Sequence, residues 1–258
     1  MNRASIVIFL FLINFIIFPL RLLAQSSQLI SQGVDIRFIP RTSNQTSPSG
    51  GTRGTTTTDN RGPGSRGDCL SKSIPLTRLG GGSKLESTIS DRPTFWVYVP
   101  YAPEEASSGE FSLQDGEKNI YRTPFSLSKT PGIVSVTIPP TVEPLEIGKK
   151  YRWYFTLNCP QREGSPENST PAFVTGQVQR IGISSELDSQ LKAVKTALER
   201  AAIYAKNGIW YDTVTELGQL RLKEPENREA INAWINLFKS EEVRLGEISA
   251  ERIVGNVN

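Results

Sequence analysis

Residues 145–155 read Leu145-Glu146-Ile147-Gly148-Lys149-Lys150-Tyr151-Arg152-Trp153-Tyr154-Phe155, and this stretch decides the fold. Tyr151, Trp153 and Phe155 occupy every second position, so a β-strand places their rings on one face. We predict a strand from Lys150 to Cys159 whose aromatic face joins a core. We also expect the Tyr151 hydroxyl to form a hydrogen bond with the backbone of the preceding loop.

Six further segments have the same character: they are short, rich in Val, Ile, Phe, Tyr and Trp, and bounded by Gly, Pro, Asp and Asn. They are Lys84 to Ser90, Thr94 to Tyr101, Glu110 to Gln114, Asn119 to Leu127, Gly132 to Pro139 and Ala172 to Ile181. Asp115-Gly116-Glu117-Lys118 predicts a hairpin turn, because Asp and Gly tolerate positive backbone angles. Seven short strands within about 110 residues predict an antiparallel β-sandwich.

The stretch around Tyr151 resembles the tyrosine corner of immunoglobulin-like and fibronectin-type domains, with Leu145 and the alternate aromatics filling the core. We therefore expect an immunoglobulin/fibronectin-like sandwich over residues 73–183. Because this architecture carries many unrelated activities, it predicts no function.

After Ser184 the apolar period changes from two to between three and four, which is typical of helices. One apolar face contains Leu187, Leu191, Val194, Leu198, Ala201 and Ala205. It predicts one helix that begins at Ser184-Ser185 and ends at Asn207-Gly208. Two more helices are predicted over residues 209–223 and 227–239.

The C-terminal part, residues 184–258, resembles a single tetratricopeptide repeat. The similarity lies in the spacing of Ala197, Ala201, Tyr204, Gly208, Leu217, Leu220 and Pro225. Since one repeat cannot bury its faces alone, this helical domain must pack on the sandwich, on the third predicted helix or on another chain.

The chain begins with a basic start, Met1-Asn2-Arg3, followed by an apolar run from Ile6 to Leu20. The run is shorter than the roughly twenty residues that span a bilayer, so we predict a signal peptide over residues 1–24, cleaved after Ala24. Arg21 leaves open an uncleaved membrane anchor. The expected location is periplasmic or extracellular, with the inner membrane reached only through this segment.

Residues 25–72 are predicted to form a disordered linker. The tract from about Arg37 to Asp68 is rich in Thr, Ser, Gly, Pro and Arg, as in Ser47-Pro48-Ser49-Gly50-Gly51. Such a composition buries too little apolar surface to offset its ordering entropy.

The composition excludes several classes of site. With no histidine and two cysteines, the chain cannot build Ser-His-Asp or Cys-His catalysis, imidazole zinc sites or four-cysteine metal sites. Cys69 and Cys159 form a disulfide in an oxidising compartment, or are two unpaired thiols. Removal of the signal peptide takes away two arginines and no acid, so the formal charge falls from +3 to +1. A nucleic-acid partner is therefore not expected.

The chain also resembles the cyanobacterial family called domain of unknown function 928. The resemblance covers about Cys69 to Val254 and is carried by residues 91–101 (DRPTFWVYVPY), 121–123 (YRT), 131–134 (PGIV), 148–155 (GKKYRWYF) and 208–212 (GIWYD). The family has no assigned activity, so the resemblance implies no reaction, although it agrees with an exported protein.

Four aromatic residues are the candidate binding residues. Trp96 and Tyr98, with Tyr101 nearby, could form an exposed strip on the strand Thr94 to Tyr101, of the kind that stacks on sugar rings or anchors a protein. Alternatively, the C-terminal helices cover this strip. Tyr211, together with arginine side chains, could line a peptide-binding groove between the sandwich and the helices.

No catalytic residue, metal site or cofactor is predicted. The acids Glu104, Glu105, Asp115 and Glu117 lie in loops, where carboxylates are usually solvated. We expect a non-enzymatic binding or scaffold protein of the cell envelope whose partner is another envelope or surface protein. A carbohydrate-binding sandwich that recognises polysaccharide is the alternative, and a glycosidase with two carboxylates is less favoured.

Overall fold

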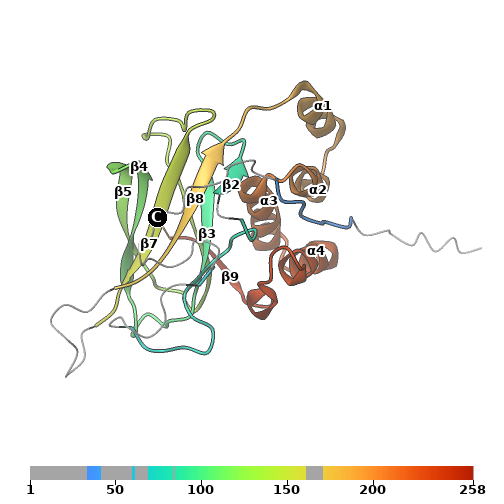
Figure 1. Ribbon diagram of the computed structural model, residues 1–258. Coiled ribbons are helices and arrows are strands. Elements are labelled where there is room, and N and C mark those ends of the chain that lie inside the picture. Colours follow the sequence, from blue (N-terminus) through green and yellow to red (C-terminus); the bar gives the residue numbers. More distant parts are fainter. Residues whose placement is uncertain (1–33, 42–59, 62–68, 84, 161–170, 258) are drawn as a thin grey trace, which may run out of the picture. The chain divides into compact units, whose positions relative to one another are not determined.

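The computed structural model describes residues 34–41, 60–61, 69–83, 85–160 and 171–257, which all belong to one unit, Gly33–Asn258. It is strand-rich and contains two β-sheets and, in this part of the chain, four α-helices (Figure 1). The predicted signal peptide, residues 1–24, lies outside the described residues.

The larger sheet has five strands in the order β2-β8-β7-β4-β5. Their bounds are Leu85–Thr88 for β2, Ala172–Arg180 for β8, Lys150–Asn158 for β7, Ser108–Asp115 for β4 and Lys118–Ser126 for β5. The predicted hairpin is confirmed: Asp115 pairs with Lys118, and Gly116 between them has a φ of 60°.

The smaller sheet has four strands in the order β1-β3-β6-β9. Their bounds are Thr77–Arg78 for β1, Thr94–Val99 for β3, Gly132–Thr137 for β6 and Ile253–Asn256 for β9. The prediction of a purely antiparallel sandwich is wrong at two places, because β2 pairs with β8 and β6 with β9 in parallel. Long stretches of chain separate the members of both pairs, so no hairpin fixes their direction.

The inward face of β7 forms the aromatic core between the sheets. Trp153 and Phe155 are buried, and the Phe95 ring of β3 lies 5.2 Å from the Trp153 ring. The Tyr151 hydroxyl accepts a hydrogen bond from the backbone N–H of Glu146 at 3.0 Å, as the sequence predicts. The loop before β7 is thus fixed to the strand that it precedes.

The helices are α1 (Ser185–Ala193), α2 (Ala197–Lys206), α3 (Trp210–Lys223) and α4 (Arg228–Lys239), with a short 3₁₀ turn at Gly246–Ile248. The single helix predicted from Ser184 to Asn207 is therefore wrong. Thr196 starts a new helix instead: its hydroxyl accepts from the N–H of Glu199, whose carboxylate accepts from the N–H of Thr196.

Helix α3 covers the smaller sheet, whose strand β3 is buried on both faces. Helix α3 contacts β3 and β9 of the smaller sheet and also β2, which is an edge strand of the larger sheet (Figure 1). Strand β9 follows the helices and returns to the smaller sheet, so residues 184–258 contribute a strand to that sheet as well as the helices.

Part of the predicted linker, residues 25–72, packs on this unit. Within residues 34–41, Ile36 and Phe38 are buried, and the Phe38 ring lies edge-on to the Trp210 ring at 4.8 Å. These apolar side chains occupy alternate positions, a pattern that the polar composition of the following residues obscures. Residues 25–33, 42–59 and 62–68 lie outside the described part of the chain.

The predicted disulfide between Cys69 and Cys159 is confirmed, with the two Cα atoms 5.1 Å apart. It links the segment before β1 to the residue that follows β7.

Candidate functional site

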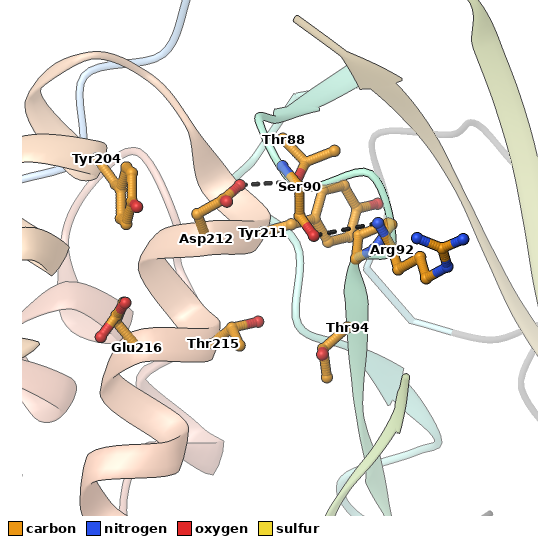
Figure 2. A pocket seen from close by; sticks show the side chains of 10 residues that line it. Thr88, Ser90, Arg92, Thr94, Tyr204, Tyr211, Asp212, Thr215 and Glu216 are labelled. Atoms are coloured by element: carbon orange, nitrogen blue, oxygen red, sulfur yellow. Dashed lines mark hydrogen bonds between the residues drawn. The ribbon is translucent and has the colours of Figure 1, made fainter. Parts of the chain in front are cut away.

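A pocket of about 120 Å³ lies where the β2–β3 connection meets helices α2 and α3 (Figure 2). Its lining is mostly polar and comprises Thr88, Ser90, Arg92, Pro93, Thr94, Tyr204, Tyr211, Asp212, Thr215 and Glu216. Ser90, Arg92, Thr215 and Glu216 are only partly buried and form its rim.

The start of α3 places Asp212 in this pocket. Gly208, with a φ of 66°, makes the turn between α2 and α3. Trp210 then points into the core, where its indole N–H donates to the carbonyl of Leu79 at 2.8 Å. Two residues later, Asp212 faces β2, and its Oδ2 accepts from the Thr88 hydroxyl at 2.7 Å and from the Ile89 N–H at 3.1 Å.

The electrostatics of the pocket are governed by the partial burial of its acidic groups. Burial raises the pKa of Asp212 to about 6, and the hydrogen bonds from Thr88 and Ile89 only partly oppose this rise. Burial, followed by the nearby carboxylates of Asp212 and Glu216, raises the pKa of Tyr204 to about 12. Both groups therefore ionise less readily in the folded protein than they would in water.

The other two charged groups in the lining are already paired. The Arg92 guanidinium donates to the carbonyl of Val142 and contacts Asp91, and it points away from Asp212 (Figure 2). Glu216 forms a two-pronged pair with Arg200 of α2, with both N–O distances at 3.0 Å. Asp212 accepts its hydrogen bonds from neutral donors alone among the described residues.

Replacing Asp212 by Asn should stabilise the protein at neutral pH. The raised pKa means that ionisation costs the folded state free energy, so this cost is absent below the unfolded pKa of 3.8 and complete above about 6. An amide keeps the acceptor for Thr88 without the charge. We expect a gain of about 2 to 3 kcal/mol at pH 7.5 and almost none at pH 3.5.

Urea unfolding of wild-type and Asp212→Asn protein at both pH values measures this difference. Asp188→Asn is the control, because Asp188 lies on the exposed helix α1 and pairs with Lys192. An equal effect of Asp212→Asn on the free energy of unfolding at the two pH values would contradict a raised pKa for Asp212.

Behind the pocket lies a buried polar network. Arg78 and Glu86 form an ion pair with both side chains 1% exposed and N–O distances of 3.1 and 3.2 Å. Burial raises the pKa of Glu86 even though Arg78 opposes the rise. The Tyr211 hydroxyl accepts from the Trp153 indole N–H at 2.8 Å and interacts with Glu86, so α3 is joined to strands β7 and β2 of the larger sheet.

Residues 51–253 match the model of the family Domain of Unknown Function (DUF928). The chain belongs to this family. No curated protein matches the chain. All ten residues that line the pocket fall within the range that matches DUF928.

In this DUF928 protein the predicted aromatic strip is covered. Trp96, Tyr98 and Tyr101 are 2%, 6% and 5% exposed, and the Trp96 indole N–H donates to the hydroxyl of Thr215 on α3 at 3.1 Å. Of the two alternatives for the strip, the structure therefore shows the one in which it is not solvent-facing. The three rings offer no free face to a sugar.

The fourth candidate, Tyr211, lines the pocket between the sheets and the helices, where the sequence places a groove. Its ring is buried and packs edge-on to Phe95 at 5.2 Å. Arg92 is the arginine that lines the same pocket. Tyr211 thus forms the back of the pocket, whereas Asp212, which sequence reasoning missed, supplies its charge.

The close contact of α3 with Trp96 predicts an unusual effect of a glycine substitution. Gly218→Ala would ordinarily favour the helix by up to about 1 kcal/mol. Here the added Cβ would lie 2.7 Å from the Trp96 ring. We expect a loss of about 1 to 3 kcal/mol in urea unfolding, and almost no change for Gln219→Ala on the exposed face. Stabilisation by Gly218→Ala would contradict this packing.

Two of the loop carboxylates considered in the sequence are held in ion pairs. Glu105 binds Lys72 at 2.6 Å and Asp115 binds Lys149 at 2.7 Å. Within the described residues, no three His, Cys, Asp or Glu side chains gather as metal ligands would. In the same part of the chain, no helix combines the length and the apolar character needed to cross a bilayer.

Proposed function

We propose that the protein is an exported, non-enzymatic binding protein of the cell envelope, periplasmic or extracellular, that engages another protein. The Cys69–Cys159 disulfide supports export, because such bonds persist mainly in oxidising compartments. The apolar segment at the start of the chain supports the same location.

The size of the pocket favours one class of partner over the others. Its volume of about 120 Å³ is smaller than that of pockets for drug-sized molecules, which measure about 300 to 1,000 Å³. One side chain would fill this volume, whereas a sugar chain or a typical metabolite would extend beyond it. A polypeptide that inserts a single side chain between the sheets and α3 is therefore the favoured partner.

Two finer features of the fold belong to this proposal. The hydrogen bond between the Glu146 N–H and the Tyr151 hydroxyl supports an immunoglobulin/fibronectin-like sandwich. The packing of α2 on α3 across Gly208 supports a tetratricopeptide-like helical pair. The resemblance noted in the sequence also favours a cyanobacterial source.

Site-specific photo-crosslinking in cells tests the proposal. A photoreactive residue at Ser90, on the pocket rim, should give a covalent adduct with one envelope protein. The matched control carries the same residue at Glu117, which is exposed in the β4–β5 hairpin turn. Equal adducts from both positions, or none from Ser90, would contradict a protein partner at the pocket.

Export is tested separately by fusing residues 1–30 to a reporter that is active only outside the cytoplasm. We expect reporter activity that Leu12→Arg, within the apolar run, abolishes. A silent wild-type fusion would contradict export without bearing on the pocket.

A further inference from the structure

We propose that the pocket binds one cationic side chain, a lysine ammonium or an arginine guanidinium, of a polypeptide partner, with Asp212 as its counter-charge. This inference rests on the proposed function and deepens it, because it names the chemical group that the partner must present.

The charge of Asp212 is the first argument. Its carboxylate is held by the Thr88 hydroxyl and the Ile89 N–H, which are neutral donors. Arg92 is engaged by Asp91 and the Val142 carbonyl, so it does not neutralise this charge. A largely buried carboxylate without a cationic partner is unfavourable, and a ligand that brings a positive charge would remove most of the cost.

The hydrogen-bonding character of the lining is the second argument. Besides Asp212, the carboxylate of Glu216 and the hydroxyls of Ser90 and Tyr204 line the pocket. The Tyr204 hydroxyl has no hydrogen-bond partner among the described residues. Lysine and arginine heads are pure donors, and this lining is rich in acceptors. An anionic ligand would instead meet the carboxylates of Asp212 and Glu216.

Binding should depend on pH in a defined direction. Thr88 from β2, Tyr204 from α2 and Glu216 from α3 line the pocket with Asp212, whereas the Arg92 guanidinium points away from Asp212. The pKa of Tyr204 is about 12, while the pKa of Asp212 is about 6. Cation binding needs ionised Asp212, so the affinity should fall about tenfold from pH 7 to pH 5.

Titration of the mature chain with short peptides, followed by amide NMR, tests the inference. The probe is acetyl-Gly-Lys-Gly-amide, and its neutral isostere carries norleucine in place of lysine. We expect the amide signals of Ile89, Ser90 and Thr215 to shift with the lysine peptide, with a Kd on the order of 1 mM. The norleucine peptide should bind at least about tenfold more weakly than the lysine peptide.

Asp212→Asn should abolish the response to the lysine peptide, while Asp188→Asn on the exposed helix α1 should keep it. The amide spectrum of the free Asp212→Asn protein shows whether the variant is folded. Equal binding of the two peptides, or unchanged binding by folded Asp212→Asn, would overturn the inference.

Butylammonium and guanidinium ions distinguish the source of the cation. Shifts at Ile89 and Ser90 with these ions but not with the lysine peptide would overturn the assignment to a polypeptide. If Asp212→Asn protein still forms the photo-crosslinked adduct from position 90, the proposed protein partner is supported and the role of Asp212 as its counter-charge is contradicted. If the wild-type chain binds the lysine peptide but forms no photo-crosslinked adduct in cells, the proposed protein partner is contradicted instead.

Discussion

Glu86→Gln is expected to lower the free energy of unfolding by about 3 to 5 kcal/mol. Arg78 and Glu86 are both almost fully buried, and they form an ion pair with N–O distances of 3.1 and 3.2 Å. The amide in Glu86→Gln can still accept from the Gly81 N–H, as the carboxylate does at 2.7 Å, so the backbone turn keeps its acceptor. What the variant loses is the charge that compensates the buried guanidinium.

Urea unfolding at pH 7 measures this loss, and two variants give it a reference. Glu110→Gln removes a carboxylate from an ion pair with Arg122 at the surface, where a loss below about 1 kcal/mol is expected. Arg78→Met combined with Glu86→Leu removes both charges and should recover most of the stability. A loss below 1 kcal/mol for Glu86→Gln would show that Arg78 does not depend on this carboxylate.

All seven strands predicted from alternation are present, and all except β5, in which Phe125 alone is buried, have a face buried in the core between the sheets or under α3. Strand β1 has two residues, too few for a period to be detected, and β9 follows the helices as a four-residue strand. Alternation also placed Trp96 and Tyr98 on the second face of β3. It could not tell whether a further layer covers that face, since this depends on where α3 packs.

The charged residues of the candidate site were missed for a related reason. Asp212 follows Trp210 and Tyr211 in the sequence, and nothing local shows that burial will raise its pKa to about 6. Its one signal was membership of the stretch 208–212, which carries part of the family resemblance. The Arg78–Glu86 pair had a weak signal, the three glycines 80–82 between them, which let the chain fold closely around the two charges.

Loss of the disulfide is the second large effect that we expect. Cys69 and Cys159 are 90 residues apart in the sequence, and a loop of this length gives a chain-entropy contribution of about 4 to 5 kcal/mol. Reduction should lower the free energy of unfolding by this amount. Urea unfolding with and without a thiol reductant measures it, and Cys69→Ser combined with Cys159→Ser is the control that the reductant should not affect.

The disulfide also connects stability to the compartment in which the protein works. Domains of this size are usually stable by about 5 to 15 kcal/mol, so a loss of 4 to 5 kcal/mol removes about a third or more of the total. Protein retained in a reducing cytoplasm should then be degraded faster than exported protein. Thiol labelling of unfolded, unreduced protein from the envelope should detect no free cysteine. Full labelling there, together with equal stability before and after reduction, would show that the bond does not form in the cell.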